Sequence, residues 1–161
     1  MSKQEVSRRI FLVEKLPESD IISVDPEVCV GCRTCELMCS LHHEGEFGLA
    51  LSRLYVSRNP FEAVFVPEVC RQCVAPACYV VCPVERAMKI DEKTGARLIV
   101  EEKCIGCGAC ARACPWNGEN HIIRLNASKK VYVKCDLCGG APKCVEFCPV
   151  NALTYVSKER K

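Results

Sequence analysis

Long apolar runs and aromatic side chains are what this sequence has least of. No segment approaches the ~20 consecutive apolar residues that a transmembrane helix needs, and aromatic residues make up 6% of the 161 residues. We therefore expect no direct insertion into a membrane. The scarcity of aromatics predicts a modest apolar core, because these side chains bury the largest areas.

Motifs that carry substrate chemistry are missing as well. The sequence has no phosphate-binding P-loop, no G-x-G-x-x-G dinucleotide motif and no recognisable nucleophile with its base. We expect no catalytic residue in this chain, so any reaction would take place on a partner. The formal net charge is +2, and the basic residues are scattered without interleaved aromatics. A nucleic-acid partner is therefore not expected.

A twin-arginine export motif is matched near the N-terminus, where Ser7–Leu12 reads SRRIFL. An export signal also needs an apolar stretch of roughly 7–15 residues. Residues 13–20 instead hold four charges and a proline. We expect a β-strand there, and whether the match has any meaning stays open. The protein is expected to be cytoplasmic, where thiols stay reduced and metal binding is the more frequent use of cysteine.

Cysteine is the abundant residue, with sixteen in the chain. They form four groups of four along the sequence: Cys29, Cys32, Cys35 and Cys39; Cys70, Cys73, Cys78 and Cys82; Cys104, Cys107, Cys110 and Cys114; Cys135, Cys138, Cys144 and Cys148. Every group begins C-x2-C and ends C-x3-C, and no cysteine is left over. The pattern is an internal repeat, in which only the middle spacing varies.

The spacing within each group is typical of iron–sulfur proteins. Residues 104–115 match in full the ferredoxin run C-x2-C-x2-C-x3-C-P, whose fourth cysteine ligates the other cluster of a pair. Zinc sites usually separate two C-x2-C pairs by a longer spacer, and disulfides would be cramped in such short loops. We therefore predict four [4Fe–4S] clusters, with all sixteen cysteines as iron ligands.

Short elements are expected around the cysteines. Three β-hairpins are expected, with strands at 54–57 and 63–66, at 88–90 and 97–100, and at 121–125 and 131–133. The last two cysteines of each group are spaced i, i+4, which predicts a short helical turn with both sulfurs on one face. Residues 41–45 are compatible with a continuation of the first helix. The expected fold class is α+β.

Four motifs carry a resemblance to a known family: Val28–Leu37, Cys114–Asn117, Lys134–Cys138 and Cys148–Leu153. They are similar to motifs of the four-cluster ferredoxin-like subunits of molybdenum and tungsten pterin enzymes, formate hydrogenlyase and carbon monoxide dehydrogenase. The likeness spans about residues 24–156. The compact size most resembles the small subunit of tungsten aldehyde oxidoreductases.

The resemblance implies a tandem bacterial-ferredoxin-like fold of two pseudo-twofold modules, each with two [4Fe–4S] clusters. Groups one and four would form one module, and groups two and three the other. The four-cluster domain would span residues 29–161. Residues 1–28 would form an N-terminal strand and partner-docking segment, and the long gap at 40–69 is a second candidate for docking.

The family pairing also implies how the cysteines share the clusters, because each group lends its last cysteine to its partner group. The implied ligand sets are Cys29, Cys32, Cys35 and Cys148 for cluster 1; Cys70, Cys73, Cys78 and Cys114 for cluster 2; Cys104, Cys107, Cys110 and Cys82 for cluster 3; and Cys135, Cys138, Cys144 and Cys39 for cluster 4.

The function implied by the resemblance is single-electron relay within a hetero-oligomeric oxidoreductase complex. The partners would be a large catalytic subunit, of the pterin type, and a flavin- or NAD-binding subunit or a soluble ferredoxin. A free-standing polyferredoxin and an electron-transfer subunit of carbon monoxide dehydrogenase or hydrogenase are the alternatives. A cluster-based redox sensor is a third hypothesis, which the absence of a DNA-binding helix disfavours.

A few other side chains could influence the clusters. His42 and His43 are expected at a solvated helix end, and Trp116 is expected to shield a cluster from water. Charged residues inside the loops either tune reduction potentials or are merely solvated: Arg33, Arg71, Arg112 and Lys143 would favour the reduced state, and Asp136 would oppose it.

Overall fold

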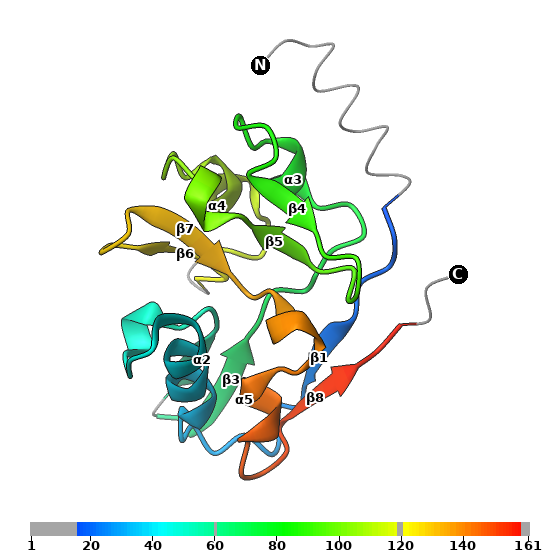
Figure 1. Ribbon diagram of the computed structural model, residues 1–161. Coiled ribbons are helices and arrows are strands. Elements are labelled where there is room, and N and C mark those ends of the chain that lie inside the picture. Colours follow the sequence, from blue (N-terminus) through cyan, green and yellow to red (C-terminus); the bar gives the residue numbers. More distant parts are fainter. Residues whose placement is uncertain (1–15, 60, 119–120, 159–161) are drawn as a thin grey trace.

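The computed structural model describes residues 16–59, 61–118 and 121–158 (Figure 1). Within these ranges the strands pair into four two-stranded antiparallel sheets. The pairs are β1 (Ile21–Val24) with β8 (Leu153–Val156), β2 (Tyr55–Asn59) with β3 (Val64–Glu68), β4 (Met88–Ile90) with β5 (Arg97–Ile99), and β6 (Ile123–Asn126) with β7 (Val131–Lys134).

Side chains in the turns explain two of the hairpins. In the β4–β5 turn, the Asp91 carboxylate accepts hydrogen bonds from the backbone N–H and the hydroxyl of Thr94, at 2.8 and 2.7 Å. In the β6–β7 turn, the Asn126 side-chain oxygen accepts from the Ser128 hydroxyl at 2.7 Å and the Lys129 N–H at 3.2 Å. Such bonds satisfy the turn backbone locally, which is why these residue types are frequent in turns.

Short helices follow the cysteine loops. They are α2 (Thr34–Glu44), α3 (Ala77–Val80), α4 (Ala109–Ala113) and α5 (Lys143–Glu146), with short 3-10 turns η1 (Leu49–Leu51), η2 (Glu101–Lys103) and η3 (Leu137–Gly140). Helix α2 does continue beyond the first cysteine group. It ends at Gly45, whose left-handed backbone (φ 74°) lets its N–H bond the Leu41 carbonyl.

The elements gather in two regions, which Figure 1 shows one above the other. Helix α2 packs on α5 next to the β1–β8 pair, whereas α3 packs on α4 near the β4–β5 and β6–β7 hairpins. The first and last cysteine groups therefore lie together, as do the second and third. The small α+β architecture is as predicted, and the three expected hairpins are confirmed with boundaries shifted by one or two residues.

The apolar core is small and rich in sulfur. Its most buried aliphatic residues include Leu54, Val56, Ile122 and Leu137, each at most 2% exposed. Several cysteines belong to the same cluster of buried side chains. No helix among the described residues is long and apolar enough to cross a membrane. The SRRIFL match at Ser7–Leu12 lies outside the described residues. Of the strand expected after it, residues 16–20 are described and are not in a strand, and β1 begins only at Ile21.

The segment before β1 ties the two regions together. The Asp20 N–H donates to the Thr94 carbonyl at 2.8 Å, and the Arg97 guanidinium donates to the Pro17 carbonyl at 2.8 Å. The Asp20 side chain in turn accepts from the hydroxyl of Tyr155, a residue of β8. This segment therefore contacts both the β4–β5 turn and the β1–β8 pair.

At Gly95, the segment before β1 packs too closely for a side chain. Its φ is +70°, and a Cβ there would lie 2.4 Å from the Glu18 carbonyl oxygen.

We predict that Gly95→Ala lowers the free energy of unfolding by about 2–5 kcal/mol, from left-handed strain together with overpacking. Gly45→Ala is the matched control, because its φ is +74° but no described atom lies within 4 Å of its Cβ. It should cost only about 1–2 kcal/mol. Thermal unfolding followed by circular dichroism compares the two, and equal losses would contradict the close packing at Glu18.

Candidate metal centres

Four cysteines surround each of four cavities, and each cavity draws on two distant parts of the chain. We call these cavities sites 1 to 4. They are lined by Cys29, Cys32, Cys35 and Cys148 at site 1; Cys70, Cys73, Cys78 and Cys114 at site 2; Cys82, Cys104, Cys107 and Cys110 at site 3; and Cys39, Cys135, Cys138 and Cys144 at site 4. The structure thus brings together the four sets of thiols that the resemblance implied, while their ligation of iron stays a prediction.

The helices explain why each group is split between two sites. Helix α2 carries Cys35 to site 1 and Cys39, one turn later, to site 4. Around α5, Cys144 faces site 4 and Cys148 faces site 1. Residues one helical turn apart are separated by a rise of about 5.4 Å along the helix axis. The i, i+4 spacing therefore places two sulfurs on one face, but at two neighbouring sites.

Backbone N–H groups point at several sulfurs. The N–H of Arg53 donates to Cys39 Sγ at 3.3 Å, that of Tyr132 to Cys104 Sγ at 3.4 Å, and that of Ala152 to Cys148 Sγ at 3.2 Å. Such bonds favour the ionised thiolate and raise the reduction potential of a cluster that the thiolate holds. Tight loops make room for this approach: at Gly106 (φ +68°), a Cβ would lie 2.3 Å from the Lys130 carbonyl oxygen.

Burial makes these thiols hard to ionise on their own. It raises the pKa of Cys35 and Cys78 to about 12, and that of Cys110 and Cys138 to about 11. Burial also raises the pKa of Cys135, with the neighbouring Cys144 and Cys70 adding to the effect. Buried thiols with such pKa values become ligands only when a metal supplies the compensating positive charge.

The separation of the sulfurs bears on which metal fits. Zinc bound by ~2.3 Å Zn–S bonds in a tetrahedron would hold its sulfurs roughly 4 Å apart. Among the described residues, three ligand atoms come within 4.8 Å of one another only at His42, His43 and Cys138. No cysteine set is therefore drawn in tightly enough for a single zinc ion. The structure also contains no disulfide in its described part. Four spread thiolates around a cavity fit a cubane cluster.

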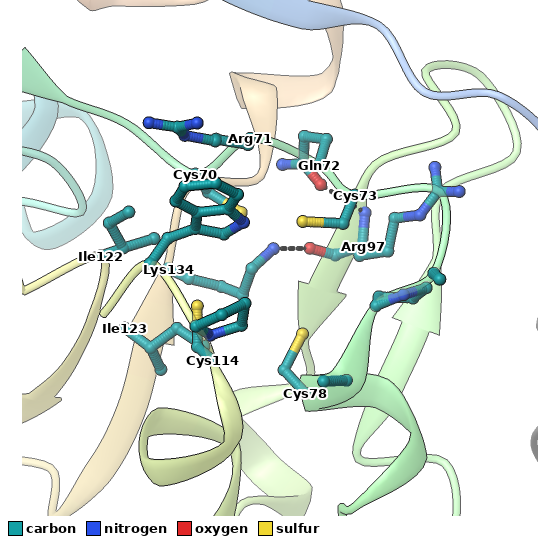
Figure 2. A pocket seen from close by; sticks show the side chains of 15 residues that line it. Cys70, Arg71, Gln72, Cys73, Cys78, Arg97, Cys114, Ile122, Ile123 and Lys134 are labelled. Atoms are coloured by element: carbon teal, nitrogen blue, oxygen red, sulfur yellow. Dashed lines mark hydrogen bonds between the residues drawn. The ribbon is translucent and has the colours of Figure 1, made fainter. Parts of the chain in front are cut away.

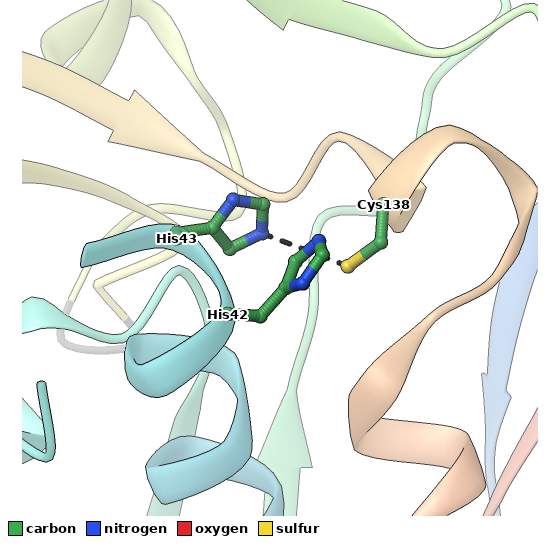
Figure 3. Close-up of side chains that lie close together, drawn as sticks. All are labelled: His42, His43 and Cys138. Carbon is green, nitrogen blue, oxygen red and sulfur yellow. Dashed lines mark hydrogen bonds between the residues drawn. The ribbon is translucent and has the colours of Figure 1, made fainter. Parts of the chain in front are cut away.

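The two histidines on α2, which Figure 3 shows beside Cys138, differ in their exposure. His42 is exposed, but only 9% of the His43 side chain is. His43 Nε2 lies 3.6 Å from Cys138 Sγ and 3.4 Å from Asp136 Oδ1. Burial lowers the pKa of His43 to about 4, so the ring is neutral near pH 7. The expectation of a solvated helix end is therefore wrong for His43, which belongs to the surroundings of site 4.

The charged loop residues are mostly paired. Arg33 bonds Glu36 at 2.6 Å, and Lys143 bonds Glu146 at 2.6 Å. The Arg112 guanidinium donates to the Cys107 carbonyl at 3.1 Å. The carboxylate partners of Arg33 and Lys143 offset the influence that these two charges would have on a nearby cluster.

Figure 2 shows the residues around site 2, which the sequence predicted less completely than those of the other sites. Its cavity has a volume of about 300 Å³. Trp116 lines this cavity, as expected of a shield, and the Arg71 guanidinium lies 3.7 Å above its ring. Lys134 also lines it, although no role at a site was predicted for this residue. The signal available was a lysine directly before Cys135, but the expected strand ended at residue 133 and the lysine was noted only as part of a family-like motif.

Known proteins similar to this chain are iron–sulfur or electron-transport proteins. The family described as 4Fe-4S dicluster domain matches residues 61–158. The polyferredoxin-like subunit of aliphatic sulfonate oxidoreductase from Pyrococcus furiosus is 47% identical over 135 residues, which cover 84% of this chain and 75% of that protein. Electron transport protein HydN from Escherichia coli is 32% identical over 160 residues, covering 86% and 89%.

A solved structure of the BamBC active site complex of benzoyl coenzyme A reductase also matches. It has a TM-score of 0.51 and 27% sequence identity, and the match covers 88% of this chain and 80% of that chain. Together with the sixteen cysteines, the family match identifies four [4Fe–4S] clusters as the cofactors of this protein. The chain belongs to the 4Fe-4S dicluster family of ferredoxin-like electron-transport subunits.

Proposed function

We propose that this chain relays single electrons along four [4Fe–4S] clusters between a catalytic subunit and an electron acceptor or donor. The observation that carries the proposal is that all sixteen thiols are gathered into four adjoining sites. Relatives are named as electron transport proteins or as subunits of oxidoreductases, which supports a non-catalytic role in a complex. Each bound cluster would supply the uptake and release of one electron.

In this proposal the four thiols that line each site are its iron ligands. Sites 1 and 4 would form one ferredoxin-like module, joined by α2 and α5. Sites 2 and 3 would form the other, joined by α3 and α4. The chain's own part is to hold the thiolates, donate N–H bonds to their sulfurs and keep water away, and these factors set reduction potentials.

Electrostatic interactions between thiols of different sites support one order of the sites. The charge of Cys35 raises the pKa of Cys144, which links sites 1 and 4. Cys70 does the same for Cys135, linking sites 2 and 4. The charge of Cys110 raises the pKa of Cys78, which links sites 2 and 3. We propose the row 1, 4, 2, 3, with short steps between neighbours.

The two ends of this row are open to partners. Of the sixteen cysteines, Cys32 at site 1 and Cys107 at site 3 are the two that are exposed. Each has an exposed apolar neighbour, Val30 at 57% and Ile105 at 67%. Protein interfaces favour such apolar patches at their centres. Electrons would enter and leave at these ends, and the segment 1–28 remains our proposal for an additional docking element.

The type of partner follows from the motif resemblance. We propose a large pterin-containing catalytic subunit, of the tungsten or molybdenum type and similar to aldehyde oxidoreductase, in an anaerobic cytoplasmic complex. A subunit of carbon monoxide dehydrogenase or hydrogenase is the alternative partner system, and a free-standing polyferredoxin is the alternative role.

Anaerobic purification of the tagged full chain from its own cells tests this function. We expect a large subunit to co-purify in fixed ratio, with tungsten or molybdenum in the complex. Nickel in place of both would favour the alternative partner system, and isolation of the brown chain alone would favour a free carrier. A chain that cannot be reduced by one electron per cluster would contradict electron relay altogether.

Paired cysteine substitutions test the shared ligation. If Cys29 and Cys148 hold one cluster, the double variant Cys29→Ala with Cys148→Ala should lose one cluster, as each single variant does. Cys135→Ala with Cys148→Ala should lose two clusters. Iron analysis of anaerobically reconstituted protein measures the loss. The reverse result would show that Cys148 serves its own group.

Removal of iron should unfold the chain. Few aliphatic residues could replace the clusters in so small a core, and ligand binding of this kind contributes directly to folding. Treatment with a chelator under reducing conditions should therefore abolish most of the helix and strand signal in circular dichroism. Retention of a cooperative thermal transition by the iron-free chain would contradict this prediction.

A further inference from the structure

Lys134 is a buried cation that the relay described above does not use. It ends β7, is 2% exposed and lines site 2. Its ammonium donates to the carbonyl oxygens of Arg97 and Cys135, the latter at 3.3 Å. Figure 2 shows the side chain reaching into the space between Cys73, Cys78 and Cys114. The positive charge is thus held by neutral carbonyls, next to thiols.

The lining of site 2 carries positive charge without negative charge. Among the described residues that line it, Arg71, Arg97 and Lys134 are basic and none is acidic. Arg97, like Lys134, bonds neutral carbonyls: its guanidinium donates to Gly95 and Pro17, at 2.7 and 2.8 Å. Figure 2 shows this guanidinium directed away from the sulfurs, whereas the Lys134 ammonium points between them. Lys134 is therefore the basic side chain whose charge is directed at the thiols.

Arg71 contributes less, because its charge is partly offset. Its guanidinium lies over Trp116 at 3.7 Å, at the outer side of the cavity. The nearby Glu68 carboxylate interacts with it electrostatically. Lys134 is thus the basic side chain of site 2 whose charge points at the thiols and has no acidic partner among the described residues of the lining.

The other three sites lack such a charge. At site 1, Arg33 is paired with Glu36 at 2.6 Å. At site 4, Arg53 is paired with Asp136 at 3.0 Å, and His43 lies 3.4 Å from the same carboxylate. At site 3, no charged side chain is found among the described residues that line it. Site 2 is therefore the most electropositive of the four.

Lys134 also stands at the junction of the two central sites. Its neighbour Cys135 lines site 4, and the Cys135 carbonyl accepts a hydrogen bond from the Gln72 side chain at 2.9 Å. Gln72 in turn lines site 2 and accepts from the Arg97 N–H at 2.8 Å. The lysine is thus anchored within the wall between sites 2 and 4.

We propose that site 2 holds the most easily reduced of the four clusters, and that Lys134 is the positioning residue that sets this order. The proposal rests on the proposed function, in which site 2 holds a [4Fe–4S] cluster. Each one-electron reduction adds a negative charge to a site. A buried cation nearby stabilises that added charge, and low local polarity strengthens the attraction. Lys134 would therefore create an electron-holding position in the middle of the row.

Potentials of the anaerobically purified holoprotein test the role of Lys134. In a dithionite titration followed by electron paramagnetic resonance, Lys134→Gln should lower the equilibrium constant for reducing one cluster at least tenfold, or about 59 mV. The equilibrium constants for reducing the other three clusters should change less than threefold.

Lys134→Arg keeps the positive charge and should retain the wild-type order of reduction potentials. Lys143→Gln is the control, because that lysine is a surface residue paired with Glu146. An unchanged potential in a Lys134→Gln protein with full iron content would overturn the proposal.

A second set of variants locates the most easily reduced cluster even if the Lys134 variants fail to bind iron. Cys78→Ala removes a site 2 thiol and should abolish the first signal to appear on reduction. Cys104→Ala removes a site 3 thiol and should leave that signal in place. Loss of the first signal in Cys104→Ala alone would overturn the order. A wild-type protein without any reducible cluster would instead refute the proposed function.

Discussion

Sulfur atoms buried in a small apolar core must either stay protonated or face a positive charge. Cys35, Cys78 and Cys135 are each less than a tenth exposed, and burial raises the pKa of all three. A metal–sulfide core removes this conflict, because it brings the positive charge inside the cavity. The folded chain is then a set of short loops and turns that present thiolates to four such cores.

This requirement also accounts for the small size of the regular elements. Strands of three to five residues, and the helices α3, α4 and α5 of four or five residues, would be marginal by themselves. They are held by the sites that they border and by a few long-range links. The Asp20 to Thr94 bond and the Gln72 to Cys135 bond are examples that join distant segments.

The sequence predicted much of this arrangement because the relevant signals are local. Cysteine spacing, the i, i+4 pairs and turn residues such as Asp91 and Asn126 each act within a few positions. The family match and the four cysteine cavities agree with the cofactor expectation. Boundaries moved by one or two residues, as at β2, which starts at Tyr55 rather than residue 54.

What could not be predicted arises from packing between distant segments. His43 reads as a solvated residue at a helix end, but η3 covers it with Cys138 and Asp136. Lys134 follows the strand expected at 131–133 and had no predicted role, yet it is buried in the wall between two sites. In both cases neighbours that are distant in sequence determine the burial, and no local pattern reports them.

The central claim is that iron and sulfide, and no other chemistry, organise the sixteen thiols. Native mass spectrometry of the anaerobically isolated chain measures this most directly. The account predicts a mass increase equal to four [4Fe–4S] cores, with every thiol protected from alkylation. A mass increase matching zinc ions, or a metal-free chain with S–S bonds, would contradict it.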